Sequence, residues 1–456
     1  MKKLLLAISL TLFISHACAE FVIPKYTKTT LKNGLTVYLM EQDEVPLIDI
    51  KMVTNAGAIY DGESYGLANL TGDALSYGSV KLSKQEIEDL FDFHGANFSS
   101  NVGLESSTTG LSISSKDVEK LMPVIRDIIL EPSFDSTEFA KEKKLYIDQL
   151  KQSREQPRSV LGPLFNKLYY KEHPYGNPIS GDMKSIEKIT LKQIKSFYRQ
   201  FYVPNNSALI VVGDFNAKKM EKLIKSLFSE WEPVQIPIIV FEDWNIPTQS
   251  NVLLVNKSDA KETTFIIGGK GVTANHPDEV ALQVINTILG GRFTSWLNDE
   301  LRVNSGLTYG ARSRFNSESK AGTFIISTFT KTETTFEAMD LAIKTYHRLW
   351  DKGIDKKTLE SAKSYVKGQF PPRYETSGQL ASLLARMWSL DLSESFINDF
   401  QKTVDSLTVE KANKIVTENF PKDNLQFVMV GKVDDIKEKA KDYGTVKQID
   451  IKTFTF

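Results

Sequence analysis

Two side chains in the second half of the sequence are of types that could stabilise a developing negative charge. Arg302 and Tyr309 stand seven residues apart, within the stretch LRVNSGLTY. A guanidinium and a phenol both donate hydrogen bonds, and donors that converge on a peptide carbonyl stabilise the oxyanion formed when that carbonyl is attacked. Without their sequence context, a surface arginine and a tyrosine at the edge of the core would explain this spacing better.

The intervening residues predict how the pair would be positioned. Arg302 is expected near the end of a helix, because Asn304, Ser305 and Gly306 favour termination through a left-handed glycine. A strand is expected to begin over residues 307–311. Tyr309 would then lie beside the end of that helix.

The histidines do not form a zinc motif. Two imidazoles four residues apart on one face of a helix could share a metal, but no pair of histidines in this chain has that spacing. The five histidines are at positions 16, 94, 173, 276 and 347. His276 and Glu279 make half of such a motif, but Val280 cannot be a ligand, so this stretch predicts a helix start with acids near its N-terminus. The glycine pair at 290–291 lacks the lysine and hydroxyl residue of a phosphate-binding loop and predicts a packing turn.

Composition and the N-terminus bound the class of protein. With a formal net charge of −1 over 456 residues, nothing favours a nucleic acid or an anionic membrane as partner. Residues 1–19 predict a signal peptide: two lysines, an apolar stretch over 4–14 and an Ala-Cys-Ala cleavage site. We therefore expect an exported, periplasmic protein without a transmembrane segment. Lipid attachment at Cys18, the only cysteine, is the less favoured alternative, because Ser15 stands where a lipoprotein signal has leucine.

The remaining sequence alternates strand and helix patterns and repeats itself. Strands are expected at 34–39, 47–53 and 208–212, and helices at 66–76, 118–129, 136–154 and 190–202. Residues 190–214 match 408–432 without a gap, and residues 55–75 match 269–289. Two matches in the same order favour an internal duplication. Pro233, Pro237 and Pro247 predict a linker, with the boundary near residue 243.

Several segments, in this order, resemble the insulinase/pitrilysin family of metallopeptidases. The segments are LKNGLTV at 31–37, GLA at 66–68, GAN at 95–97, HPYG at 173–176, residues 197–214, and the frame L-R-x-x-x-G-L-x-Y at 301–309. The resemblance implies an α/β (α+β) fold of two homologous halves, each a mostly antiparallel sheet packed against helices. These would be an N-terminal peptidase-like domain over 20–243 and a C-terminal one over 244–456.

The zinc motif of the family is degenerate here. Catalytic members carry H-x-x-E-H on a helix, with two zinc ligands, a general base and a later glutamate as third protein ligand. The aligned stretch is Asn69-Leu70-Thr71-Gly72-Asp73, and the later position falls near Asp148 or Gln149. The oxygen ligands of Asn69, Asp73 and Asp148 suit harder ions than zinc. Gly72 offers no base, so we expect no metal in this chain.

The resemblance implies a function shared between two chains. In the family, the residues matching Arg302 and Tyr309 contact the substrate backbone at a zinc site from the opposite half of the enzyme. We therefore expect a zinc-less subunit, inactive alone, whose homologous H-x-x-E-H partner holds the zinc and whose substrate is a peptide. A structural or peptide-binding scaffold with no catalytic role is the alternative, and an active peptidase with an altered metal site is a third, least favoured interpretation.

Overall fold

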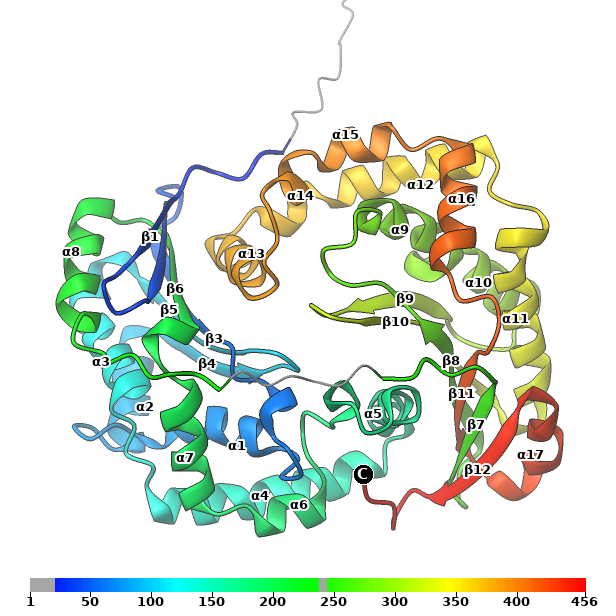
Figure 1. The fold of residues 1–456 in the computed structure, drawn as a ribbon, viewed down its shortest axis with the longest axis horizontal. Coiled ribbons are helices and arrows are strands. Elements are labelled where there is room, and N and C mark those ends of the chain that lie inside the picture. Colours follow the sequence, from blue (N-terminus) through cyan, green and yellow to red (C-terminus); the bar gives the residue numbers. More distant parts are fainter. Residues whose placement is uncertain (1–20, 238–243) are drawn as a thin grey trace, which may run out of the picture.

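The computed structural model describes residues 21–237 and 244–456 and contains two six-stranded sheets, one in each half of the chain. Figure 1 shows the two halves side by side, with both sheets near the centre and most helices outside. The expected signal peptide, Cys18 and the boundary near residue 243 lie outside the described residues. Within the described ranges, no helix has the length and apolarity needed to cross a membrane.

The first sheet has the order β1-β2-β6-β3-β5-β4, and only the β2–β6 pair is parallel. Its strands are β1 Thr27–Thr30, β2 Thr36–Glu41, β3 Leu47–Thr54, β4 Asn97–Val102, β5 Ser107–Ser114 and β6 Ser207–Gly213. The central β6 is buried along its whole length. A continuous apolar run of this kind is what burial on both faces of a sheet requires.

The second sheet repeats this arrangement in the order β12-β7-β11-β8-β10-β9. Its strands are β7 Asn251–Asn256, β8 Glu262–Lys270, β9 Arg312–Ser317, β10 Gly322–Lys331, β11 Gln426–Gly431 and β12 Thr445–Asp450. The parallel β7–β11 pair corresponds to β2–β6, and β8, β10 and β9 follow in the same antiparallel order as β3, β5 and β4. The predicted α/β fold of two homologous halves is thus confirmed. Only the outer strands differ, since β12 runs parallel to β7 whereas β1 runs antiparallel to β2.

Several helices begin where a side chain accepts a hydrogen bond from one of their first backbone N–H groups. The first half contains α1 Leu67–Ala74, α2 Lys84–His94, α3 Val118–Leu130, α4 Ser136–Arg154, α5 Pro157–Tyr170, α6 Met183–Lys188, α7 Leu191–Phe201 and α8 Ala217–Phe228. The second contains α9 Glu279–Asn286, α10 Trp296–Asn298, α11 Thr335–Asp351, α12 Lys356–Gln369, α13 Ser377–Ser389, α14 Ser395–Asn398, α15 Phe400–Asp405, α16 Val409–Asn419 and α17 Val433–Ala440. Thr190 caps α7 in a reciprocal capping box with Gln193, and Asp135 caps α4.

The two halves exchange a helix. Side chains on one face of β6, among them Leu209 and Val211, pack against α3, α7 and α8 of the same half. The opposite face packs against α13, which belongs to the second half. In return, α5 of the first half covers β8 and β11 of the second sheet through Leu164 and Phe165. Each half therefore completes the core of the other.

Candidate functional site

The helix aligned with the zinc motif, α1, begins at a preorganised turn. Gly66 adopts φ +91°, in the left-handed region, and the buried carboxylate of Asp61 accepts the backbone N–H groups of Gly66 and Ala68 at 2.7 Å each. Burial raises the pKa of Asp61 to about 7, although these hydrogen bonds act to lower it. Asp61 thus positions α1 by capping it.

The ligand positions of the motif are occupied by a closed polar network. The Asn69 amide donates to the Asp73 carboxylate at 3.4 Å and to the Tyr146 hydroxyl of α4 at 3.2 Å. Burial, and after it the charge of Glu142 on α4, raise the pKa of Asp73 to about 6. Asp148 and Gln149, the expected third-ligand positions, are exposed, and Asp148 pairs with Lys151 at 3.0 Å.

The position of the general base is filled by the neighbouring strand. A Cβ atom on Gly72 would meet Val102 Cγ2 of β4 at 2.6 Å, and the Ser100 hydroxyl donates to the Gly72 carbonyl at 2.8 Å. Strand β4 therefore packs directly on α1 where a glutamate side chain would have to stand. In the described ranges, no group of three His, Cys, Asp or Glu side chains could hold a metal ion. The residues present do not fit a zinc ion.

Arg302 lies on the surface of the second half. It belongs to a π-helical turn over Asp299–Asn304, which ends, as expected, at a left-handed glycine, Gly306, with φ +66°. Its guanidinium lies over the ring of Phe293, 4.4 Å from the centroid. Phe293 is 70% exposed and Arg302 is half-buried, so this cation–π contact holds the guanidinium at the surface.

Tyr309 is 84% exposed, and its ring stacks on Phe329 at a centroid distance of 6.3 Å. The expectation that a strand begins over residues 307–311 is wrong, because β9 starts at Arg312. Side chains take the place of ladder partners here: the Thr328 hydroxyl donates to the Gly310 carbonyl at 2.9 Å, and the Ala311 N–H donates to Asn298 at 3.0 Å. Tyr309 therefore stands on an irregular segment between the helical turn and the strand.

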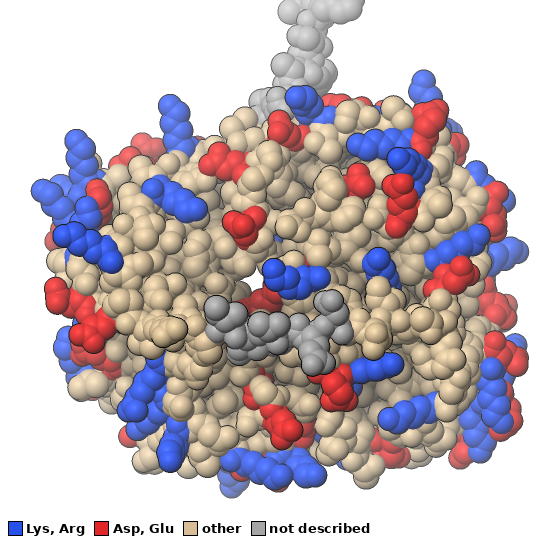
Figure 2. Space-filling model, in the orientation of Figure 1, with Lys and Arg blue, Asp and Glu red and all other residues tan. Residues whose placement is uncertain are grey.

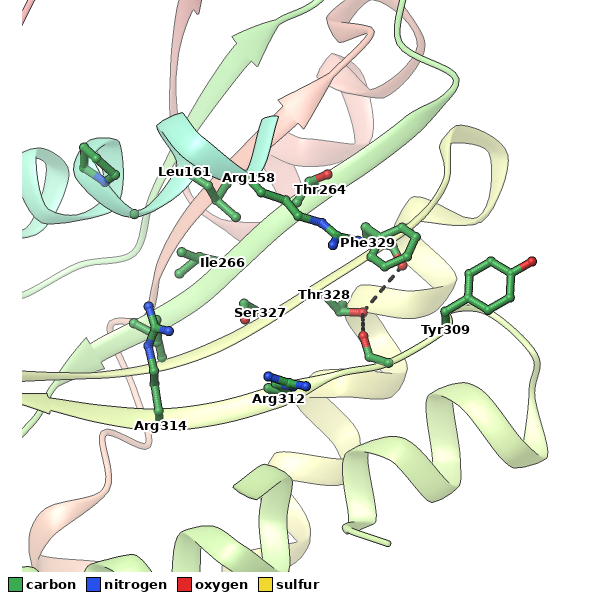
Figure 3. A pocket seen from close by; sticks show the side chains of 14 residues that line it. Arg158, Leu161, Thr264, Ile266, Tyr309, Arg312, Arg314, Ser327, Thr328 and Phe329 are labelled. Atoms are coloured by element: carbon green, nitrogen blue, oxygen red, sulfur yellow. Dashed lines mark hydrogen bonds between the residues drawn. The ribbon is translucent and has the colours of Figure 1, made fainter. Parts of the chain in front are cut away.

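A cavity of about 690 Å³ connects Tyr309 to a group of arginines. Its lining includes Arg158 from α5, Arg312 and Arg314 from β9, and Tyr309, but not Arg302. Figure 3 shows Tyr309 at one end of the pocket and Arg314 at the other, with the Tyr309 hydroxyl directed away from the arginines. The structure thus brings only one member of the predicted pair to the pocket. These three arginines are not among the site residues predicted from the sequence, although an Arg-x-Arg spacing in a strand places two side chains on one face.

A second cavity, of about 600 Å³, lies between the halves. The β4–β5 and β9–β10 loops, equivalent in the duplication, meet at its wall, where the Ser319 N–H donates to Glu105 at 3.0 Å. Burial, followed by the charge of Glu105, raises the pKa of Glu318 to about 7. On the face in Figure 2, acidic and basic side chains are interspersed, without a large area of one sign. This face does not resemble a nucleic-acid-binding surface.

Comparison with known families and proteins gives consistent matches. The model described as "Insulinase (Peptidase family M16)" matches residues 37–183, and the model described as "Peptidase M16 inactive domain" matches residues 188–366. Among curated proteins, the zinc protease PqqE of Helicobacter pylori is 24% identical over 92% of this chain and 96% of its own length. An uncharacterized zinc protease, YmxG of Bacillus subtilis, is 21% identical over 86% of this chain and 95% of its own.

Solved structures share the fold. The "peptidase M16 inactive domain" structure from Pseudomonas fluorescens superposes with a TM-score of 0.83 at 25% identity, covering 89% of this chain and 98% of that one. The periplasmic protease PqqL of Escherichia coli gives a TM-score of 0.75 at 18% identity, over 90% of this chain and 46% of that one.

Proposed function

Because this chain belongs to the insulinase family of peptidases, M16, we propose that it is the zinc-less subunit of a two-chain metallopeptidase. A homologous partner with an intact H-x-x-E-H motif holds the zinc ion. This chain contributes Arg302 and Tyr309 to the peptide substrate bound between the two subunits. The proposal includes export to the periplasm.

The observation that carries the proposal is the exposure of Tyr309 together with apolar side chains that flank the half-buried Arg302. Tyr309 is 84% exposed, and two apolar neighbours in this region, Phe293 and Val303, are 70% and 69% exposed. Large apolar side chains exposed near one another mark surfaces that bind a partner or ligand. These side chains do not pack in the core of this chain. A partner that closes on this surface would bury them.

The state of α1 supports the division of labour. Val102 occupies the space of the general base, and the Asn69 amide donates hydrogen bonds to both Asp73 and Tyr146. A chain that retains donors for an oxyanion but has a filled metal site would depend on another chain for water activation. The cation–π contact of Arg302 with Phe293 is worth only about 0.5–1 kcal/mol at an exposed site, so the guanidinium can turn to a substrate carbonyl at little cost.

Reconstitution tests the proposal. The mature chain is co-expressed with an exported homologue that has an intact H-x-x-E-H motif, and the mixture is resolved by size-exclusion chromatography. We expect a complex that cleaves a fluorogenic peptide, one zinc ion per complex, and no turnover by this chain alone. A zinc-bearing homologue that is fully active alone and forms no complex would instead favour a peptide-binding scaffold.

A further inference from the structure

The cavity beside Tyr309 has an uncompensated positive wall. Three arginines line it, Arg158, Arg312 and Arg314, and no aspartate or glutamate does. In the part of the chain that the structure describes, none of the three forms an ion pair. Lys257, by contrast, forms ion pairs with Glu155 and Asp259. Three unpaired guanidiniums around one concave surface attract an anion.

The strand register fixes how two of these arginines face the cavity. Arg312 and Arg314 alternate on β9 and so project from the same face of the sheet, about 7 Å apart along the strand. They lie opposite Ser327 and Ile325 of β10, which also line the cavity. Both arginines are exposed, so their fork-shaped donor groups can reach one ligand from two sides.

The third arginine comes from the other half. Arg158 stands in the first turn of α5, directly after Pro157, and its guanidinium lies 4.4 Å from the centroid of the Phe329 ring. A guanidinium that lies over a ring keeps N–H groups available for hydrogen bonds to a ligand. Because α5 is the helix exchanged between the halves, the positive wall exists only when both halves are assembled.

The rest of the cavity favours a peptide over an inorganic ion. Its lining includes apolar side chains, Leu161, Ile266 and Ile325, and the hydroxyl residue Ser327. Strand β9 is the last strand of its sheet, pairing only with β10 among the described strands, and a free strand edge can bind an extended peptide backbone. An apolar surface beside a free edge and a cationic wall fits a peptide that carries a carboxylate next to an apolar residue.

We propose that Arg158, Arg312 and Arg314 form a subsite for a peptide carboxylate, either an acidic side chain or the C-terminal carboxylate. The subsite rests on the proposed function and deepens it, because the group bound there determines which part of the peptide lies next to Tyr309. The substrate class is therefore acidic peptides or peptides held by their C-terminus.

Direct binding to the isolated mature chain tests the subsite without any zinc partner. Fluorescence anisotropy compares labelled peptides that differ only by Glu or Gln, each with a free or an amidated C-terminus. Hydrogen bonds to a charged group predict that loss of the recognised carboxylate weakens binding about tenfold or more, and that added salt reduces this difference. The Glu/Gln pair reports a side-chain carboxylate, and the free/amidated pair reports the C-terminus.

The variant Arg312→Gln/Arg314→Gln should abolish this discrimination, whereas lysines at both positions should retain part of it. Arg199→Gln, at an exposed position on α7, is the matched control and should bind like the wild type. Thermal melting verifies that the variants fold. Equal binding of all four peptides by the wild type, or discrimination that persists in the double glutamine variant, would overturn the subsite. Discrimination without activation of a zinc-bearing homologue would leave the subsite standing and reject the proposed function.

Discussion

Arg302 and Tyr309 differ in what they can do for a reacting peptide. If the Tyr309 hydroxyl donates mainly to the oxyanion, Tyr309→Phe should lower kcat of the reconstituted complex about 10²–10³-fold with assembly and zinc content unchanged. Arg302→Ala should also raise KM, because a guanidinium that holds the ground-state backbone contributes uniform binding. Arg302→Lys should retain only part of the wild-type activity, since an ammonium lacks the planar, forked donors of a guanidinium.

Steady-state kinetics on complexes purified by size exclusion gives these values. Tyr365→Phe is a matched control, because Tyr365 is also partly exposed, at 41%, and lies in α12. It should leave both constants unchanged. Near wild-type kinetics for the Arg302 and Tyr309 variants in a confirmed complex would reduce the pair to structural residues and remove the main argument for a catalytic partnership.

Gly72 shows that the zinc site has been filled as well as lost. Gly72→Ala should destabilise the fold by about 1–3 kcal/mol, because the new Cβ would lie 2.6 Å from Val102 Cγ2. The double variant Gly72→Ala/Val102→Ala should regain part of the lost stability. At Gly368, in α12, a Cβ meets nothing within 4 Å, so Gly368→Ala should be neutral or stabilising by up to about 1 kcal/mol. Urea denaturation measures all four proteins, and an unaffected Gly72→Ala would show that β4 yields easily.

Helix α1 contains a buried carboxyl group, Asp73, that makes the free energy of unfolding depend on pH. The pKa of Asp73 is about 6 in the folded protein against 3.8 for an exposed aspartate, so the folded state retains the proton between these values. Its contribution to stability is therefore present below about pH 4 and lost as the pH rises to about 6. Asp73→Asn should stabilise the protein on the order of 2–3 kcal/mol at pH 7.5 and hardly at all at pH 4. Urea unfolding at both pH values measures this, and parallel profiles would contradict it.

The elements also show what the sequence could predict. The helix α4 has the expected bounds, Ser136–Arg154, and Thr190 caps α7 as expected, because capping and apolar periodicity are local signals. The local sequence from Leu307 to Ala311 predicts a strand at Tyr309, whereas the side chains of Asn298 and Thr328 form hydrogen bonds with the backbone of the next two residues. The positive wall forms only because α5 packs on the sheet of the other half. No local sequence signal predicts this tertiary arrangement.

The exchange of α5 and α13 between the halves predicts that the two halves do not separate. Phe165 of α5 is 1% exposed among side chains of the second sheet, and Leu384 of α13 is fully buried in the core shared with the first. Removing α5 from the second half would expose several such side chains, each worth about 1.5–3 kcal/mol. We therefore expect both halves to unfold in a single transition. Phe165→Ala should reduce the free energy of unfolding by about 3–5 kcal/mol and leave the unfolding a single transition.

Cleavage between the halves measures this coupling directly. After cleavage at a protease site inserted between the two halves, the fragments should remain together on size exclusion and melt together, because α5 and α13 each bind the other half's sheet. Phe165→Ala should weaken the association of the cut fragments, whereas Phe93→Ala, at a side chain 82% exposed, should not. Fragments that separate readily after cleavage would mean that the exchanged helices add little, and the cationic wall formed by Arg158 with Arg312 and Arg314 would then have no stable geometry in which to hold a peptide.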